Sequence, residues 1–121
     1  MNLTKWMWML GLMGTVGLAG CGVSNQAGAV NVAARSSCKY HERCGNIGSG
    51  KSFTSVNDCE IRQSTFWNDH WEPADCDDRI NNDNLDYCLK AIEATSCSNG
   101  LDLLVTTYDK CSTKNVCAGR N

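Results

Sequence analysis

The stretch at residues 82–92, Asn82-Asp83-Asn84-Leu85-Asp86-Tyr87-Cys88-Leu89-Lys90-Ala91-Ile92, indicates the fold class. Its apolar residues recur at positions i, i+3, i+4 and i+7, namely Leu85, Cys88, Leu89 and Ile92. This spacing places all four on one face of an α-helix. Asn82 or Asp83 is expected to cap the start of that helix. Because one apolar position is a cysteine, we expect a covalent bridge as well as packing to hold the helix.

Two helices are expected before this stretch. Residues 29–43 are predicted to form the first, and Gly45 after it prevents the helix from continuing. Ser55, with Asp58 three residues later, resembles a capping box and opens a second helix that runs to about Trp71. Pro73 lies at or beyond its end. The expected apolar face of this second helix carries Val56, Cys59, Phe66 and Trp67.

One further helix is expected after the stretch at residues 82–92. It follows Asn99-Gly100, and its apolar residues with helical spacing are Leu101, Leu104, Val105 and Tyr108. Ser112 is expected to cap a last turn that reaches Cys117. The sequence therefore predicts an all-α domain, a small bundle of about four short helices with a glycine-rich loop between the first two.

Cysteine is the most unusual feature of the composition. The chain has 121 residues and nine cysteines, with 11 basic and 13 acidic side chains and a formal charge of −2. One small domain of near-neutral charge has no basic surface for nucleic acid. The cysteine density indicates an oxidising compartment, where short helices are stabilised by disulfides. Eight cysteines are predicted to pair: Cys38, Cys44, Cys59, Cys76, Cys88, Cys97, Cys111 and Cys117.

Spacing alone does not select a disulfide pairing. Eight cysteines allow on the order of a hundred pairings. If Cys38 and Cys44 both lie on a helix, their Cα atoms are roughly 9 Å apart, which is too far for a bridge. Cys111 and Cys117 are excluded in the same way only if their segment is continuously helical.

The ninth cysteine belongs to an export signal. Lys5 precedes an uncharged apolar run over residues 6–18, which is too short to span a bilayer. The run ends in Leu18-Ala19-Gly20-Cys21, which resembles the lipobox of bacterial lipoproteins. That resemblance implies cleavage after Gly20 and acylation of Cys21, an anchor in the membrane. The alternative is an ordinary secretory signal with a cysteine there by chance.

These features divide the chain into three parts. Residues 1–20 are the expected signal peptide, residues 21–37 the lipidated cysteine and a tether whose end is helical, and residues 38–121 the cysteine-rich domain. Loss of residues 1–20, which hold Lys5 and no acid, changes the formal charge from −2 to −3. Gly22, in place of an aspartate after the lipidated cysteine, favours the outer over the inner membrane.

Residues 45–52 match the phosphate-binding pattern G-x-x-x-x-G-K-S. A P-loop needs a buried strand before it and a helix directly after it. The charged residues 38–44 do not form a buried strand, so we interpret the segment as a glycine-rich interhelix loop and expect no nucleotide.

Two groups of residues in the sequence are candidate metal sites. Cys38, His41 and Cys44 have a spacing that could surround zinc on a helix, with His70 as a fourth ligand. In an oxidising compartment we favour disulfides at these cysteines and a solvated His41. Seven acids at residues 69–86 could bind calcium but lack the EF-hand pattern, and we favour a solvated acidic loop. No metal or other cofactor is therefore expected.

No catalytic constellation stands out. Trp67 and Trp71 lie i, i+4 on one helical face, and we favour core packing over a sugar-stacking platform. No nucleophile motif surrounds either histidine, and nothing selects two acids as a glycosidase pair. C-x-x-C is absent, so the sequence has no thioredoxin-like redox motif.

Residues 38–117 resemble an uncharacterised family of small cysteine-rich bacterial lipoproteins. The resemblance rests on Cys38-x5-Cys44 with Arg43, on Ile47-Gly48-x-Gly50 followed by Phe53, Ser55 and Cys59, on Trp67 and Trp71 with Pro73 and Cys76, on Leu85-x2-Cys88-Leu89-x-Ala91-Ile92, and on Cys97 and Leu101-Asp102. The proline stands one residue later than in the family pattern, after Glu72. The resemblance implies an association with natural-product biosynthesis, and it supplies no catalytic residue that could be transferred to this sequence.

The sequence thus favours a non-enzymatic envelope lipoprotein that binds an envelope protein partner or has a structural role. The alternatives are an extracytoplasmic accessory enzyme that uses the acidic stretch and His70, or a metal-binding protein.

Overall fold

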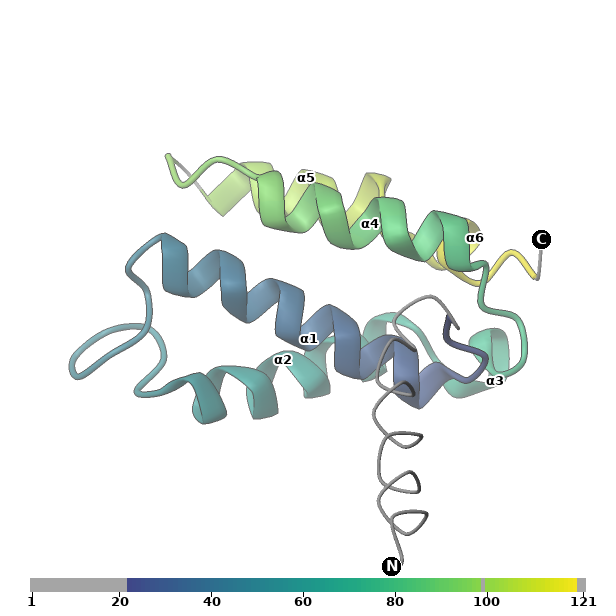
Figure 1. The fold of residues 1–121 in the computed structure, drawn as a ribbon, viewed down its shortest axis with the longest axis horizontal. Coiled ribbons are helices and arrows are strands. Elements are labelled where there is room, and N and C mark those ends of the chain that lie inside the picture. Colours follow the sequence, from purple (N-terminus) through teal and green to yellow (C-terminus); the bar gives the residue numbers. More distant parts are fainter. Residues whose placement is uncertain (1–21, 99, 120–121) are drawn as a thin grey trace, which may run out of the picture.

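The computed structural model describes residues 22–98 and 100–119, and these residues form a helical bundle (Figure 1). The expected all-α class is confirmed. The helices are α1 (Gln26–Arg43), α2 (Val56–His70), α3 (Pro73–Cys76), α4 (Asn82–Ala94), α5 (Gly100–Asp109) and α6 (Thr113–Val116). The predicted signal peptide and Cys21 lie outside the described residues, as does Asn99. Of the helices described, none is both long and apolar enough to cross a membrane.

Helix α1 begins three residues before the expected Ala29. Asn25 is its N-cap, and the side-chain oxygen of Asn25 accepts a hydrogen bond from the backbone N–H of Gly28 at 2.7 Å. The first half of α1 is central to the core, because Ala29, Ala33 and Ala34 are almost fully buried. Their small side chains let neighbouring helices approach closely. Most of the segment expected as a tether is therefore helical and packed.

The caps of the later helices agree largely with the sequence. The hydroxyl of Ser55 accepts from the backbone N–H of Asp58 at 3.0 Å, as the capping box predicts. The Asp58 carboxylate, however, accepts from the backbone N–H of Thr54 instead of Ser55. The expected cap of α4 at Asn82 or Asp83 is wrong, because Asn81 accepts from the N–H of Asn84. Ser112 caps α6 as predicted.

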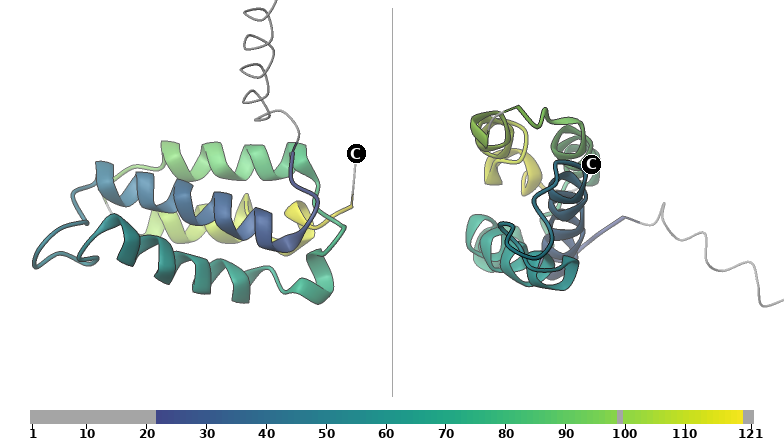
Figure 2. Two further views of the ribbon diagram at one scale, coloured as in Figure 1. Left: turned by 60° about the horizontal axis from the view of Figure 1, so that its bottom comes forward. Right: turned by 90° about the vertical axis from the view of Figure 1, so that its left-hand side faces the viewer.

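The helices pack around α1. In Figure 1, α1 and α4 run in one direction and α2 and α5 in the other. Helix α1 packs on α2 along its length and on α4, while α5 packs on α4. The end-on view in Figure 2 shows α5 on one side of the bundle and the first described residues, drawn in purple, on the side of α1 and α4.

Among the described residues, four disulfides join the segments: Cys38–Cys59, Cys44–Cys97, Cys76–Cys117 and Cys88–Cys111. They confirm the predicted even pairing of the eight cysteines. They also confirm that Cys38 and Cys44 do not pair with each other. Every bridge joins two different elements, so each one restricts the unfolded chain more than a bridge within one helix would.

Candidate functional site

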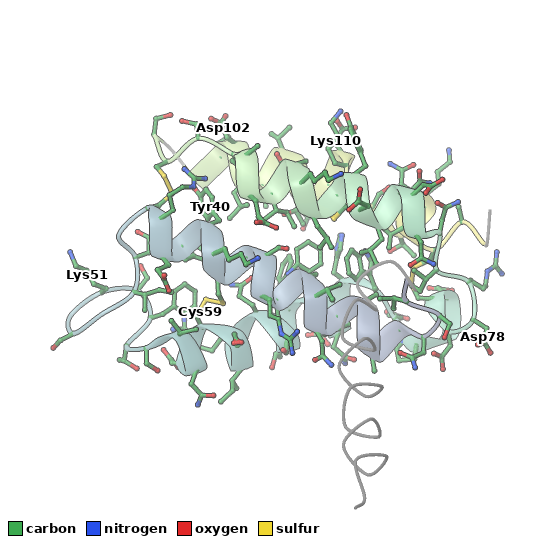
Figure 3. The ribbon with its side chains drawn as sticks, viewed as in Figure 1. Tyr40, Lys51, Cys59, Asp78, Asp102 and Lys110 are labelled. Atoms are coloured by element: carbon green, nitrogen blue, oxygen red, sulfur yellow. A yellow bond between two sulfur atoms is a disulfide. The ribbon has the colours of Figure 1, made fainter. Side chains whose placement is uncertain are left out.

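The loop at residues 45–52 does not have the arrangement of a P-loop. A single bridge pairs Ile47 with Phe53, and Gly45 and Gly50 both have a φ of +74°. Helix α2 starts only at Val56, so its N-terminus is not directly after the lysine and serine of the motif. Figure 3 shows Lys51 extending from the loop away from the helices. This agrees with its interpretation as an interhelix loop.

The proposed zinc ligands are engaged elsewhere. Cys38 and Cys44 are both oxidised in bridges, to Cys59 and Cys97. His41 was expected to be solvated, but the structure shows it half-buried. Its Nδ1 lies 3.1 Å from the Asn46 side-chain amide, its ring lies 4.8 Å from that of Phe53, and burial lowers its pKa below the ordinary value. Within residues 22–98 and 100–119, no three side chains of the metal-ligating types gather around one point.

The acidic stretch is divided among several structural roles. Asp77 accepts from the backbone N–H of Gln26 at 3.1 Å, at the positive end of α1. Asp86 forms an exposed ion pair with Lys90 at 2.8 Å, and this pair raises the pKa of the lysine. Figure 3 shows Asp78 at the end of the bundle opposite Lys51. These acids therefore serve partly as caps and partly as solvated surface.

The two tryptophans of the described domain are core residues, as predicted. Trp67 and Trp71 are 1% and 0% exposed, and their ring centroids are 4.6 Å apart. The indole N–H of Trp71 donates to the carbonyl of Cys111 at 2.8 Å, and Nε2 of His70 lies 2.9 Å from the same oxygen. His70 is thereby tied to the segment after α5 and not to the acidic loop.

The apolar face of α5 is largely exposed. Leu101, Leu104, Val105 and Tyr108 have the predicted helical spacing, and each is between 48% and 64% exposed. Helix α5 instead turns Thr107 inward, with half-buried Leu103 one turn before it. The hydroxyl of Thr107 donates to the Leu103 carbonyl at 2.9 Å, so a buried threonine is satisfied within the helix. The apolar stripe of α5 therefore lies at the surface.

A groove lies between α2 and α5. Phe66 and Trp67 line its α2 side, Leu103, Leu104 and Thr107 line its α5 side, and Ser37 of α1 contributes to it; its volume is about 180 Å³. Phe66 is 39% exposed, although it was expected on the apolar face of its helix. The groove and the exposed face of α5 together form an apolar surface, which we call the α2–α5 surface.

The segments beside this surface carry one sign of charge. Residues 63–70 and 100–109 contain Asp69, Asp102 and Asp109 and no lysine or arginine. Of the cations next in sequence, Arg62 donates to the carbonyl of Ser52 at 2.8 Å and Lys110 pairs with Asp109 at 3.3 Å. The segments that line the α2–α5 surface thus carry acidic residues and no lysine or arginine, and one of these acids, Asp109, is paired with Lys110.

A sequence signal for this surface does exist. Residues 101, 103, 104, 105 and 108 are all apolar, and together they cover more of the helix circumference than one packed face. A helix of this kind must leave some apolar side chains exposed unless it is surrounded. The i, i+3, i+4 and i+7 spacing does not identify the buried face of α5, because the buried residue on that face, Thr107, is not apolar.

The fold and the groove define a small disulfide-bridged helical domain with an open apolar surface. By sequence the chain belongs to a family of unknown function, DUF6184, which it matches over residues 38–119. The match covers the last third of α1, from Cys38 to Arg43, and all of α2 to α6. It agrees with the expected uncharacterised family. No curated protein and no solved structure matches the chain.

Proposed function

We propose that this protein is a lipid-anchored, extracytoplasmic, non-enzymatic binding domain. Its α2–α5 surface takes an amphipathic helix with a basic polar face, supplied by an envelope protein partner. The observation that carries this proposal is the exposed stripe of Leu101, Leu104, Val105 and Tyr108 beside the groove.

The chemistry of the surface supports this occupant. Contiguous apolar side chains at the surface of a small soluble domain commonly form interaction sites. An amphipathic helix that binds in such a groove places apolar anchors at i, i+3, i+4 and i+7. The segments that line the surface hold acidic residues and no lysine or arginine, which favours basic residues on the polar face of that helix.

The anchor predicted at Cys21 would leave this surface accessible. Two residues later, the backbone N–H of Val23 donates to the Asn82 side chain at 2.6 Å, and the Asn82 amide donates back to the carbonyl of Val23 at 3.0 Å. This contact holds the start of the described chain on the α4 side, away from α5 (Figure 2). An acylated Cys21 would therefore turn the α2–α5 surface away from its own membrane.

The anchor is tested separately from the groove. Mass spectrometry of the membrane-extracted protein should show an acylated Cys21, and Cys21→Ser should move the protein to the soluble fraction. An unmodified Cys21 would instead support ordinary secretion. Fractionation of the two membranes tests the expected outer-membrane location.

The groove can be tested with a leucine- and lysine-based amphipathic helical peptide. The mature chain contains two tryptophans, of which Trp67 lines the groove, so intrinsic fluorescence should report binding. Leu104→Asp places a charge in the groove and should weaken binding at least about tenfold. Ile61→Asp is the matched control. Ile61 lies on α2 and, like Leu104, is an exposed apolar residue, but it does not line the groove. Equal losses in both variants, or no binding to the native protein, would reject this use of the groove.

The association with natural-product biosynthesis is the least direct part of the proposal. It rests on the family resemblance alone. Deletion of the gene followed by profiling of secreted metabolites tests it, and unchanged profiles would remove this role without affecting the groove or the anchor.

A further inference from the structure

One of the four disulfides is placed differently from the others. The cysteines of Cys38–Cys59, Cys76–Cys117 and Cys88–Cys111 are all at most 5% exposed. In Cys44–Cys97, by contrast, Cys97 is exposed and Cys44 is half-buried. This bridge joins the C-terminal end of α1 to the connection between α4 and α5. It is therefore the bridge that an external thiol can reach.

A cation is held against the exposed sulfur. Nη1 of Arg43 lies 3.2 Å from Sγ of Cys97. The other end of the guanidinium is fixed, because Nη2 donates to the carbonyl of Glu93 at 2.9 Å and to that of Thr95 at 2.7 Å. These carbonyls lie at the C-terminal end of α4, where backbone acceptors are unpaired within the helix. Arg43 is thus positioned to stabilise negative charge on Cys97.

We propose that Cys44–Cys97 is a site of thiol–disulfide exchange. An external thiolate attacks Sγ of Cys44, and the bond between the two cysteine sulfurs breaks. A new disulfide forms between the attacking sulfur and Cys44, and the electron pair leaves on Cys97 as a thiolate beside Arg43. A cationic neighbour favours this direction, because a leaving thiol with a lower pKa departs faster. A dithiol co-reactant completes the reduction, releases Cys44 and is itself oxidised to a disulfide.

The position of the bridge links this reaction to α5. Cys97 precedes α5, and Cys111 follows it and remains bridged to Cys88. Exchange at Cys44 therefore breaks only the covalent link between α1 and the N-terminal end of α5. A change in peptide binding at the α2–α5 surface would follow, and this consequence alone rests on the proposed function.

The test titrates the folded mature protein with reduced glutathione, traps free thiols by alkylation and maps them by mass spectrometry. We expect glutathione on Cys44 and a free Cys97 at a glutathione concentration at least about tenfold below that needed for the other three bridges. Simultaneous opening of all four bridges, or earlier opening of a buried one, would overturn the proposal, as would glutathione found on Cys97 with Cys44 free.

The role of Arg43 needs a readout that is independent of folding. In Cys44→Ser, the free Cys97 should be alkylated with a pH dependence that indicates a pKa below the ordinary thiol value of about 8.5. Adding Arg43→Gln should raise that pKa. Lys39→Gln is the matched control, since Lys39 is a cation on the same helix that lies near Glu93 but does not contact the bridge. An unshifted pKa in Cys44→Ser, or an equal change in both double variants, would contradict the role of Arg43.

Discussion

The indole N–H of Trp67 donates to the hydroxyl of Ser37 at 2.9 Å, and both side chains are almost fully buried. This contact joins α2 to α1 beside the α2–α5 groove, where both residues form part of the lining. Ser37 lies just outside the matched family region, yet it satisfies a polar atom of one of the two buried tryptophans. The groove therefore depends on the part of α1 that precedes Cys38.

Ser37→Ala should destabilise the protein by about 1–3 kcal/mol, because it leaves a buried indole N–H without an acceptor. Urea unfolding followed by tryptophan fluorescence measures this change. Lys39→Ala is the control, because its side chain is 71% exposed and should change stability little. Equal stability of Ser37→Ala and the native protein would show that the hydrogen bond contributes little.

A chain that begins at Cys38 should fail to form the native bundle even though it contains all eight paired cysteines. It lacks the buried Ala29, Val30 and Ala33, and also Gln26, whose side-chain amide donates to the carbonyl of Trp71 at 2.6 Å. Circular dichroism and disulfide mapping should show reduced helicity and mixed pairing. The reference chain begins at Gly22. Native pairing and cooperative unfolding of the shorter chain would contradict the importance of this segment.

Two glycine substitutions should have opposite effects. Gly45→Ala should destabilise by about 1 kcal/mol, because Gly45 has a φ of +74° and an alanine is strained there. Gly100→Ala should stabilise by about 0.5 kcal/mol, because Gly100 begins α5 and its Cβ would meet open space. Thermal unfolding of both variants measures the difference. A common direction of change would contradict these backbone assignments.

Stability should rise with pH across the range in which His41 titrates. Burial lowers the pKa of His41 in the folded protein, so between the folded value and the unfolded value of about 6.5 the unfolded chain binds more protons. The stability from neutral His41 is therefore complete above pH 6.5 and is lost as the pH falls toward the folded pKa. Urea unfolding between pH 5 and pH 8 measures the slope of stability against pH, which His41→Gln should reduce.

Much of the fold could be predicted because its signals are local. Periodicity located α4, and caps at Ser55 and Ser112 located the starts of α2 and α6. The apolar surface could not be predicted in the same way, since which face of α5 is covered depends on neighbours distant in sequence. The disulfide pairing has the same origin: Cys44 and Cys97 meet only because α1 and α4 run side by side.

The amino-acid sequence by itself determined that the domain is helical, that eight cysteines pair and that Trp67 and Trp71 are buried, because helical spacing, cysteine number and large apolar area act within short segments or through composition. Tertiary structure alone decided which cysteines pair, which stripe of α5 remains exposed and that Arg43 meets Cys97. Each of these depends on how helices that are far apart in the chain are rotated against one another, and that rotation is set by the packing of the whole core.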